Sequence, residues 1–155
     1  MSTKEVMSYI SHELRTVLEK VDSIQFEDLQ EIRLRAKKPV MLINSRGEWF
    51  LNKDGSLLGQ PDGSYTARYS DISKTLELLS GNSIYAYQED IRNGFITIVG
   101  GHRIGIAGKV ISDEKGIKNI KDVSSINIRI AKEFKGCSRK LVKHVLKKDS
   151  VYNTI

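Results

Sequence analysis

The sequence of 155 residues has one cysteine, two prolines and no long apolar run. The single cysteine, Cys137, excludes an internal disulfide and fits a reducing compartment. No apolar run approaches the roughly 20 residues of a membrane helix, and the N-terminal residues lack the apolar core of a signal peptide. With no low-complexity tract either, the composition favours an ordinary folded domain over a disordered or membrane-spanning chain.

Several catalytic motifs are also missing. No Gly-x-x-x-x-Gly-Lys-Ser/Thr segment occurs, so these residues contain no phosphate-binding P-loop. The glycines of 100–105 lie between two strand-like runs rather than before a helix, which excludes a dinucleotide fingerprint. One cysteine and three scattered histidines do not give a zinc-ligand spacing. The sequence therefore predicts no catalytic residues, metal or cofactor site of its own.

The most informative segment is 93–111, which contains five of the twelve glycines. Aromatic and β-branched residues on both sides of Gly100 and Gly101 predict a hairpin. A two-residue turn there pairs Ile98 with Arg103, and cross-strand partners share a face. The predicted core face consists of Phe95, Thr97, Val99, Ile104 and Ile106.

The second predicted face of this hairpin is small and basic. It carries Arg103 and Lys109, with little side chain between them, so a ligand or another backbone can approach closely. The alternative is a purely structural hairpin with bulges. The glycines expected to shape its turns and open surface are Gly94, Gly100, Gly101, Gly105 and Gly108.

The remaining patterns predict an α+β fold. Residues 30–36, 40–43 and 48–51 are predicted to be strands, and their connections are too short for parallel crossovers. Residues 125–130 alternate isoleucine with polar residues, as a half-buried strand does. We expect a mainly antiparallel sheet of about five to seven strands with helices on one face. The expected helices lie within 1–25, over 70–79 and over 83–92.

The positive charge is concentrated near the end of the sequence. Residues 132–148 hold seven basic residues and one acid, which accounts for the net charge of +6. We predict a basic helix within 132–149, capped by Ser138, with Leu141 and Val145 buried. Its cations favour an acidic partner or phosphates, and a solvated helix face is the alternative. The residues expected to form this basic docking face are Lys132, Arg139, Lys140, Lys143 and Lys147.

A set of motifs covers nearly the whole sequence from Glu31 onward. They are Glu31-Ile-Arg-Leu-Arg35 with Lys38-Pro39, Ser83-Ile-Tyr85, Asn93-Gly-Phe-Ile-Thr-Ile98 with Gly100-Gly-His-Arg-Ile-Gly105, and Ser125-Ile-Asn-Ile-Arg-Ile130. Together they resemble the stage III sporulation protein AA family of endospore formers. In that family such a region precedes a P-loop ATPase domain similar to the secretion ATPases of type II and type IV systems. The resemblance implies that 1–155 form a single N-terminal regulatory and assembly domain, and that a strand at 151–155 leads into the ATPase domain.

The resemblance also implies a place and partners. The full-length protein would be a homo-hexameric ATPase that uses ATP and Mg²⁺, whereas this part would hold no cofactor. It would be cytoplasmic and peripheral to the mother-cell face of the forespore membrane, at the channel between the two compartments. Its partners would be its own ATPase domain, neighbouring subunits and other stage III sporulation channel proteins.

A wider pattern in secretion ATPases concerns the nucleotide. Their N-terminal domain has Gly-Gly-Arg before an alternating strand and a later strand ending in Arg, and its basic residues approach the phosphates of nucleotide bound to the ATPase domain. Here Gly101-His-Arg103 and Asn127-Ile-Arg129 occupy similar places. The resemblance thus implies nucleotide contacts by Arg103, His102 and Arg129, although the wider pattern has no histidine at the place of His102.

The residues alone leave three alternatives open. In the first alternative, His102 is a histidine at the end of the hairpin in contact with solvent. In the second, Arg103 pairs with a surface carboxylate such as Glu89 or Asp90. The alternative function is a small nucleic-acid-binding module that uses 132–148. The predicted strands lack paired aromatic residues for base stacking, so nucleic acid is not the expected partner.

Overall fold

The computed structural model describes residues 3–81, 89–90, 93–113, 116–132, 136–147 and 150–151. Its helices are α1 (Thr3–Met7), α2 (His12–Leu18), α3 (Ser23–Glu27), α4 (Tyr69–Leu79) and α6 (Arg139–Val145). Its strands are β1 (Glu31–Arg35), β2 (Met41–Asn44), β3 (Gly47–Leu51), β4 (Leu57–Leu58), β5 (Phe95–Ile98), β6 (His102–Asp113), β7 (Gly116–Arg129), β8 (Leu146–Lys147) and β9 (Ser150–Val151).

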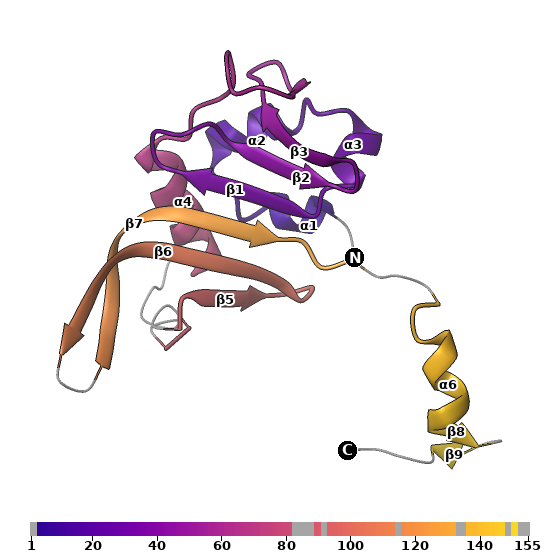
Figure 1. Ribbon diagram of the computed structural model, residues 1–155. Helices are drawn as coiled ribbons and strands as arrows, with labels where there is room; N and C mark the ends of the chain where they lie inside the picture. Colours follow the sequence, from indigo (N-terminus) through magenta and orange to yellow (C-terminus); the bar gives the residue numbers. More distant parts are fainter. Residues whose placement is uncertain are drawn as a thin grey trace.

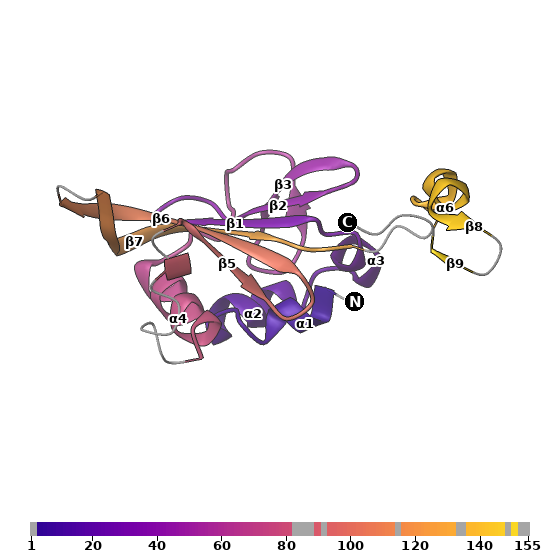
Figure 2. The ribbon, with the colours of Figure 1, turned by 90° about the horizontal axis from the view of Figure 1, so that it is seen from below.

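Seven strands form one antiparallel sheet in the order β4-β3-β2-β1-β7-β6-β5, as Figure 1 shows. In Figure 2 the helices α1, α2 and α4 lie beneath one face of this sheet. We call that the helix face, and the opposite side the open face. The expected α+β fold, with a mainly antiparallel sheet and helices on one face, is confirmed.

The helix face is held by a row of isoleucines that crosses four strands. Ile96, Ile104, Ile128 and Ile32 are cross-strand neighbours in β5, β6, β7 and β1, and all four are fully buried. Burying a side chain of this size contributes about 1.5–3 kcal/mol. Because side chains alternate along a strand, burying this row turns the residues between them to the open face.

The N-terminal helix expected within 1–25 is divided into α1, α2 and α3. The chain turns between α1 and α2, where the backbone N–H of Ser11 donates to Thr75 Oγ1 of α4 at 3.1 Å. It turns again before α3, where Asp22 Oδ1 caps the new helix by accepting from the N–H groups of Ile24 and Gln25. Each of the three helices contributes apolar side chains to the core, among them Val6, Leu14 and Phe26.

The hairpin between β5 and β6 has a longer loop than predicted. Ile98 pairs with His102, so Val99, Gly100 and Gly101 form the loop, and both glycines have positive φ. The shift of one residue exchanges the faces. The predicted core face is therefore wrong in its first strand, because Ile96 and Ile98 are buried whereas Phe95, Thr97 and Val99 are exposed.

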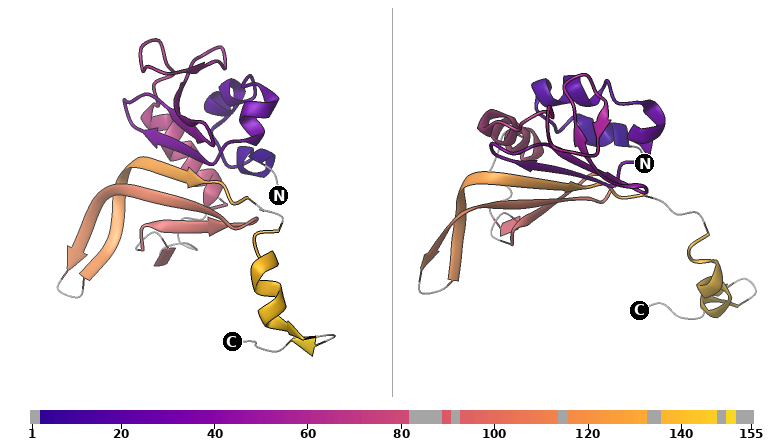
Figure 3. Two further views of the ribbon diagram at one scale, coloured as in Figure 1. Left: turned by 45° about the vertical axis from the view of Figure 1, so that its right-hand side comes forward. Right: turned by 45° about the horizontal axis from the view of Figure 1, so that its top comes forward.

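The strands β6 and β7 continue beyond the sheet as a two-stranded arm. The strand expected at 125–130 is the end of a longer strand, β7, which is paired with β6 out to Asp113 and Gly116. A bulge between Ala107 and Lys109 interrupts the pairing. Figure 3 shows that the arm bends away from the sheet.

The last helix differs from its prediction. It spans Arg139–Val145 instead of most of 132–149, and Figures 1 and 3 show it apart from the sheet and the other helices. Leu141 and Val145, expected to be buried, are exposed at 63% and 39%. Of the helix predicted over 83–92 only 89–90 fall within the described residues, and they are helical. The strand predicted over 151–155 lies outside them except for Val151.

Candidate functional site

Two arginines lie side by side on the open face. Arg103 of β6 is the cross-strand partner of Arg129 of β7, and Arg129 is in turn the partner of Glu31 of β1. The alternation that buries Ile104 and Ile128 turns both arginines to this face. Like charges directly opposite one another repel, so this pairing costs the sheet stability unless an anion lies close by.

Among the residues that the structure describes, the carboxylate that lies within 4.0 Å of this pair is that of Glu31, and it is shared with another arginine. Glu31 Oε2 is 3.7 Å from Arg129 Nε, but Glu31 Oε1 also accepts a hydrogen bond from Arg33 Nε. That hydrogen bond is the main reason why the pKa of the Arg33 guanidinium is raised. Arg33 also forms an ion pair with Glu48, in which Nη1 lies 3.1 Å from Oε1. Because the side chain of Arg129 is 70% exposed, its attraction to Glu31 is weak.

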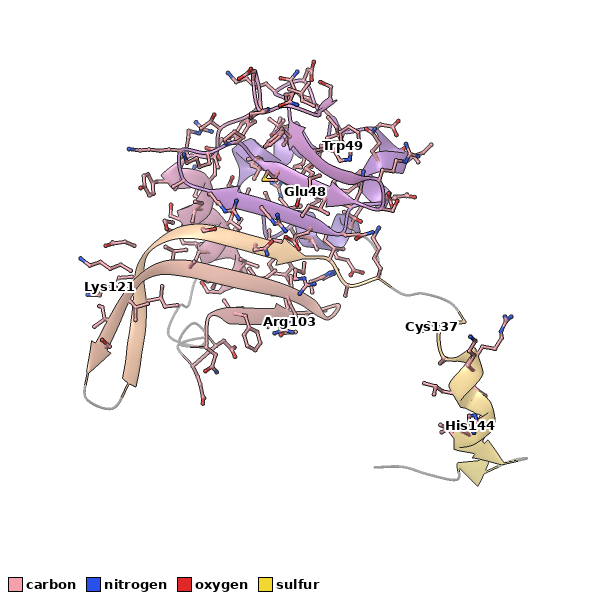
Figure 4. All side chains as sticks on the ribbon, in the orientation of Figure 1. Glu48, Trp49, Arg103, Lys121, Cys137 and His144 are labelled. Carbon is pink, nitrogen blue, oxygen red and sulfur yellow. The ribbon has the colours of Figure 1, made fainter. Side chains whose placement is uncertain are left out.

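The positive charge of Arg103 is neutralised even less than that of Arg129. Its guanidinium lies over the ring of Phe95, 4.5 Å from the ring centre, in a cation–π contact. Within the described residues no carboxylate lies within 4.0 Å of it, so the bridge to Glu89 or Asp90 is not formed there. Figure 4 shows Arg103 beside β5, and the residue is exposed.

The strand surface next to Arg103 is bare at Gly105. A Cβ atom at Gly105 would meet the nearest side-chain atom, Asn127 Cβ, at 3.7 Å, which is ordinary contact. Its φ is not in the left-handed region, so the fold does not require glycine at this position. Asn127 Oδ1 is buried and has no hydrogen-bond partner among the described residues. The open face thus has room beside the two arginines at Gly105.

Gly108 is different, because the bulge brings β7 close to it. A Cβ atom there would lie 2.6 Å from the backbone oxygen of Lys121. We expect Gly108→Ala to destabilise the domain by about 1–3 kcal/mol through overpacking, and Gly105→Ala to change its stability much less. Denaturant unfolding of the two variants measures the difference. Equal, small losses in the free energy of unfolding would show that the backbone at the bulge shifts to accept the added methyl group without cost.

The other expected turn glycines have the backbone that a turn requires. Gly94, Gly100 and Gly101 all have positive φ, which glycine adopts without a steric penalty. Gly94 also accepts the backbone hydrogen bond of Ile106.

His102 lies on the helix face, opposite to Arg103. It is fully buried, and its Nδ1 accepts a hydrogen bond from the backbone N–H of Ala131 at 3.0 Å. Its Nε2 is 3.6 Å from Glu5 Oε2 of α1. The alternative of a histidine in solvent is therefore wrong. A buried imidazole on this face also offers no surface to a nucleotide, so the contact expected of His102 is not part of the function proposed below.

Lys132, the first residue of the expected basic docking face, contacts the end of α3 instead of lying on α6. Lys132 precedes α6, and its Nζ donates to the backbone oxygen of Glu27 at 2.8 Å, 3.8 Å from Asp28 Oδ1. Arg139 and Lys140 are exposed on α6. Lys143 lies in α6 and Lys147 in β8, but their side chains are outside the described part.

Two features were missed by reasoning from the sequence. Phe95 was assigned to the core and instead supports the guanidinium of Arg103. The sequence did not predict that Asp71 is fully buried, where it accepts hydrogen bonds from Ser11, Tyr65 and Arg68. Its place at the third position of α4 was the available signal, since a carboxylate there often caps the helix.

Comparisons with known proteins place the chain in a family. The family model described as "Sporulation stage III, protein AA" matches residues 1–155. Stage III sporulation protein AA of Bacillus subtilis (strain 168) is 31% identical over 151 residues, covering 97% of this chain and 45% of the relative. The chain thus spans less than half the length of this relative.

A solved structure was also found. The VirB11 ATPase from the Brucella suis type IV secretion system, in complex with sulphate, aligns with a TM-score of 0.40 and 13% identity. The alignment covers 95% of this chain and 38% of that one. In the described part of this chain, none of the helices has the length and apolar character needed to cross a membrane.

Proposed function

Because the chain belongs to the sporulation stage III protein AA family, we propose that it is the N-terminal, non-catalytic domain of a secretion-type hexameric ATPase of sporulation. In this role it serves subunit assembly and presents Arg103 and Arg129 to the phosphates of ATP bound by the adjoining ATPase domain. The observation that carries the proposal is the adjacent, incompletely neutralised pair of arginines on the open face.

Phosphate suits this pair for two reasons. A guanidinium presents its donors as a fork that matches two phosphate oxygens at once. An anion between Arg103 and Arg129 would also relieve the repulsion of two like charges on neighbouring strands. Gly105 has no side chain of its own between Phe95 and Asn127, which lets a ligand approach the backbone of β6 more closely there. The direct test is the ATP turnover of the full-length protein with and without Arg103.

The assembly role involves α6. Its apolar side chains Leu141, Val142 and Val145 are exposed together with Arg139 and Lys140. Apolar side chains gathered on one short helix favour contact with protein over contact with water. We assign this helix to contact with the chain's own ATPase domain or a neighbouring subunit. The full-length protein would act as a homo-hexamer with ATP and Mg²⁺, beside other stage III sporulation channel proteins at the mother-cell face of the forespore membrane.

The chain by itself is expected not to hydrolyse ATP. Hydrolysis in P-loop ATPases requires the P-loop lysine and a metal ion held by its Ser or Thr, and neither motif occurs in this sequence. A phosphate-release assay on the purified 155-residue chain measures this. Steady turnover above a protein-free control would contradict the proposed division of roles.

A further inference from the structure

Three segments far apart in the sequence meet at the buried ring of His102. The residue opens β6, directly beyond the hairpin loop and directly before Arg103. Its Nδ1 accepts from the N–H of Ala131, just after β7, and its Nε2 faces the carboxylate of Glu5 in α1. A Cβ atom at Gly100 would lie 2.7 Å from Nε2, so the hairpin loop is closely packed on the ring.

The contact with Ala131 fixes which ring nitrogen carries the proton. A nitrogen that accepts from a backbone N–H is unprotonated, so the neutral ring has its proton on Nε2. Nε2 is buried without a hydrogen-bond partner among the described residues, and Glu5 Oε2 lies 3.6 Å from it. The ring is therefore oriented by its bond to Ala131 and directed toward α1.

Ala131 belongs to the segment through which the chain leaves the sheet, which we call the exit segment (130–132). Each of its residues is held in place. Ile130 N donates to Gln30 O at 2.8 Å, and Lys132 Nζ donates to Glu27 O at 2.8 Å. The contact at the middle residue is different, because the acceptor for Ala131 is the side chain of His102 on the hairpin that carries Arg103.

We propose that His102 is a positioning residue, which joins the hairpin carrying Arg103 and the exit segment into one rigid unit. The imidazole transmits the position of the exit segment to β6, and the adjacent residue in β6 is Arg103 on the opposite face. A change in the path of the chain after Lys132 thereby moves the arginine. The proposal rests on the nucleotide contact proposed above for Arg103.

Two substitutions separate this role from simple core filling. Asparagine places an amide oxygen where Nδ1 lies in histidine, so His102→Asn keeps an acceptor for the N–H of Ala131. Glutamine fills more of the same space but carries its polar atoms near the position of Nε2, so His102→Gln loses that acceptor. The measurement is amide hydrogen exchange by ¹⁵N NMR on the 155-residue chain, with the amide of Ile130 as internal control.

We expect the amide of Ala131 to exchange about tenfold faster or more in His102→Gln, because its buried N–H loses its partner. In His102→Asn its rate should stay within about threefold of the original, and the amide of Ile130 should change little in either variant. Equal exchange rates at Ala131 in the two variants would overturn the proposal. If His102→Gln unfolds the chain, loss of protection at Ala131 in His102→Asn overturns it and retained protection supports it.

The ATP turnover of the full-length protein tests the consequence for Arg103. His102→Gln should lower kcat by about threefold or more, because a small misplacement of a charge-stabilising group is costly, and His102→Asn should largely restore it. If Arg103→Ala lowers turnover but His102→Gln does not, the proposed function stands and the positioning role fails. If Arg103→Ala has no effect, the proposed function fails and with it the role of His102 toward nucleotide, while the exchange rates still decide whether the ring holds the exit segment.

Discussion

Arg103→Ala is expected to lower the ATP turnover of the full-length protein by at least about tenfold. An arginine that reaches the phosphates of a nucleotide hydrolase contributes roughly 10³–10⁵ in turnover, and tenfold is a conservative part of that range. The guanidinium is held on the open face by the ring of Phe95 and not by a carboxylate of the described residues. Its loss therefore removes a charge that the fold does not need.

Arg103→Lys should restore only part of the turnover. Lysine keeps the positive charge but not the fork of donors that binds two phosphate oxygens. The matched control is Arg35→Ala, which removes an exposed arginine from the open face two strands away and is expected to leave turnover within about twofold. Steady-state phosphate release gives kcat for each variant. Full turnover in Arg103→Ala would mean that the arginine pair of the open face does not reach nucleotide.

Asp71→Ala is expected to destabilise the domain by about 3 kcal/mol or more. The carboxylate is fully buried, and it accepts from the backbone N–H of Arg68 at 2.8 Å, the hydroxyl of Tyr65 at 3.1 Å and Ser11 Oγ at 3.3 Å. Removing it leaves three donors without their acceptor, and each buried unsatisfied donor costs about 1–3 kcal/mol. The guanidinium of Arg68 adds little, because it is largely exposed and 3.5 Å away.

The same contacts explain why Asp71 matters beyond its own helix. Ser11 precedes α2, Tyr65 lies in the segment before α4, and Asp71 is in the first turn of α4. Burial is the main cause that raises the pKa of the Tyr65 hydroxyl, which keeps it protonated as a donor. One carboxylate thus joins three segments beneath the sheet, and its loss should loosen them together.

Ser70→Ala is the matched control for Asp71→Ala. Ser70 is an exposed neighbour in the same helical turn, and its replacement is expected to change the free energy of unfolding by less than about 0.5 kcal/mol. Urea unfolding of both variants at constant pH gives the difference. A loss in Asp71→Ala no larger than that of Ser70→Ala would show that water replaces the carboxylate at no cost.

The candidate site was predicted from the sequence only in part. Arg103 and Arg129 were both chosen, but a motif does not show that they are neighbours. Their adjacency comes from the register of β6 against β7, which the burial of Ile104 beside Ile128 sets. Phe95 was missed because the hairpin was given a two-residue turn. A loop one residue longer has almost the same local chemistry, yet it moves every side chain of β5 to the other face.

The sequence by itself determined the class of the fold. Isoleucines at every second position of 126–130 and short connections between the first strands are enough for an antiparallel sheet with one buried face, because strand geometry alternates side chains and short loops cannot cross a sheet. Side-chain alternation and loop length are local properties, because they depend only on a few neighbouring residues.

The tertiary structure alone decided what His102, Asp71 and α6 do. Ala131 and Glu5 meet His102, and Ser11 meets Asp71, from positions far away in the chain. The apolar stripe of α6 predicted burial, but a stripe does not specify which surface covers it, and Leu141 is exposed here. Contacts of this kind depend on where the whole chain places each segment, because burial and hydrogen bonding act between residues that the sequence does not bring together.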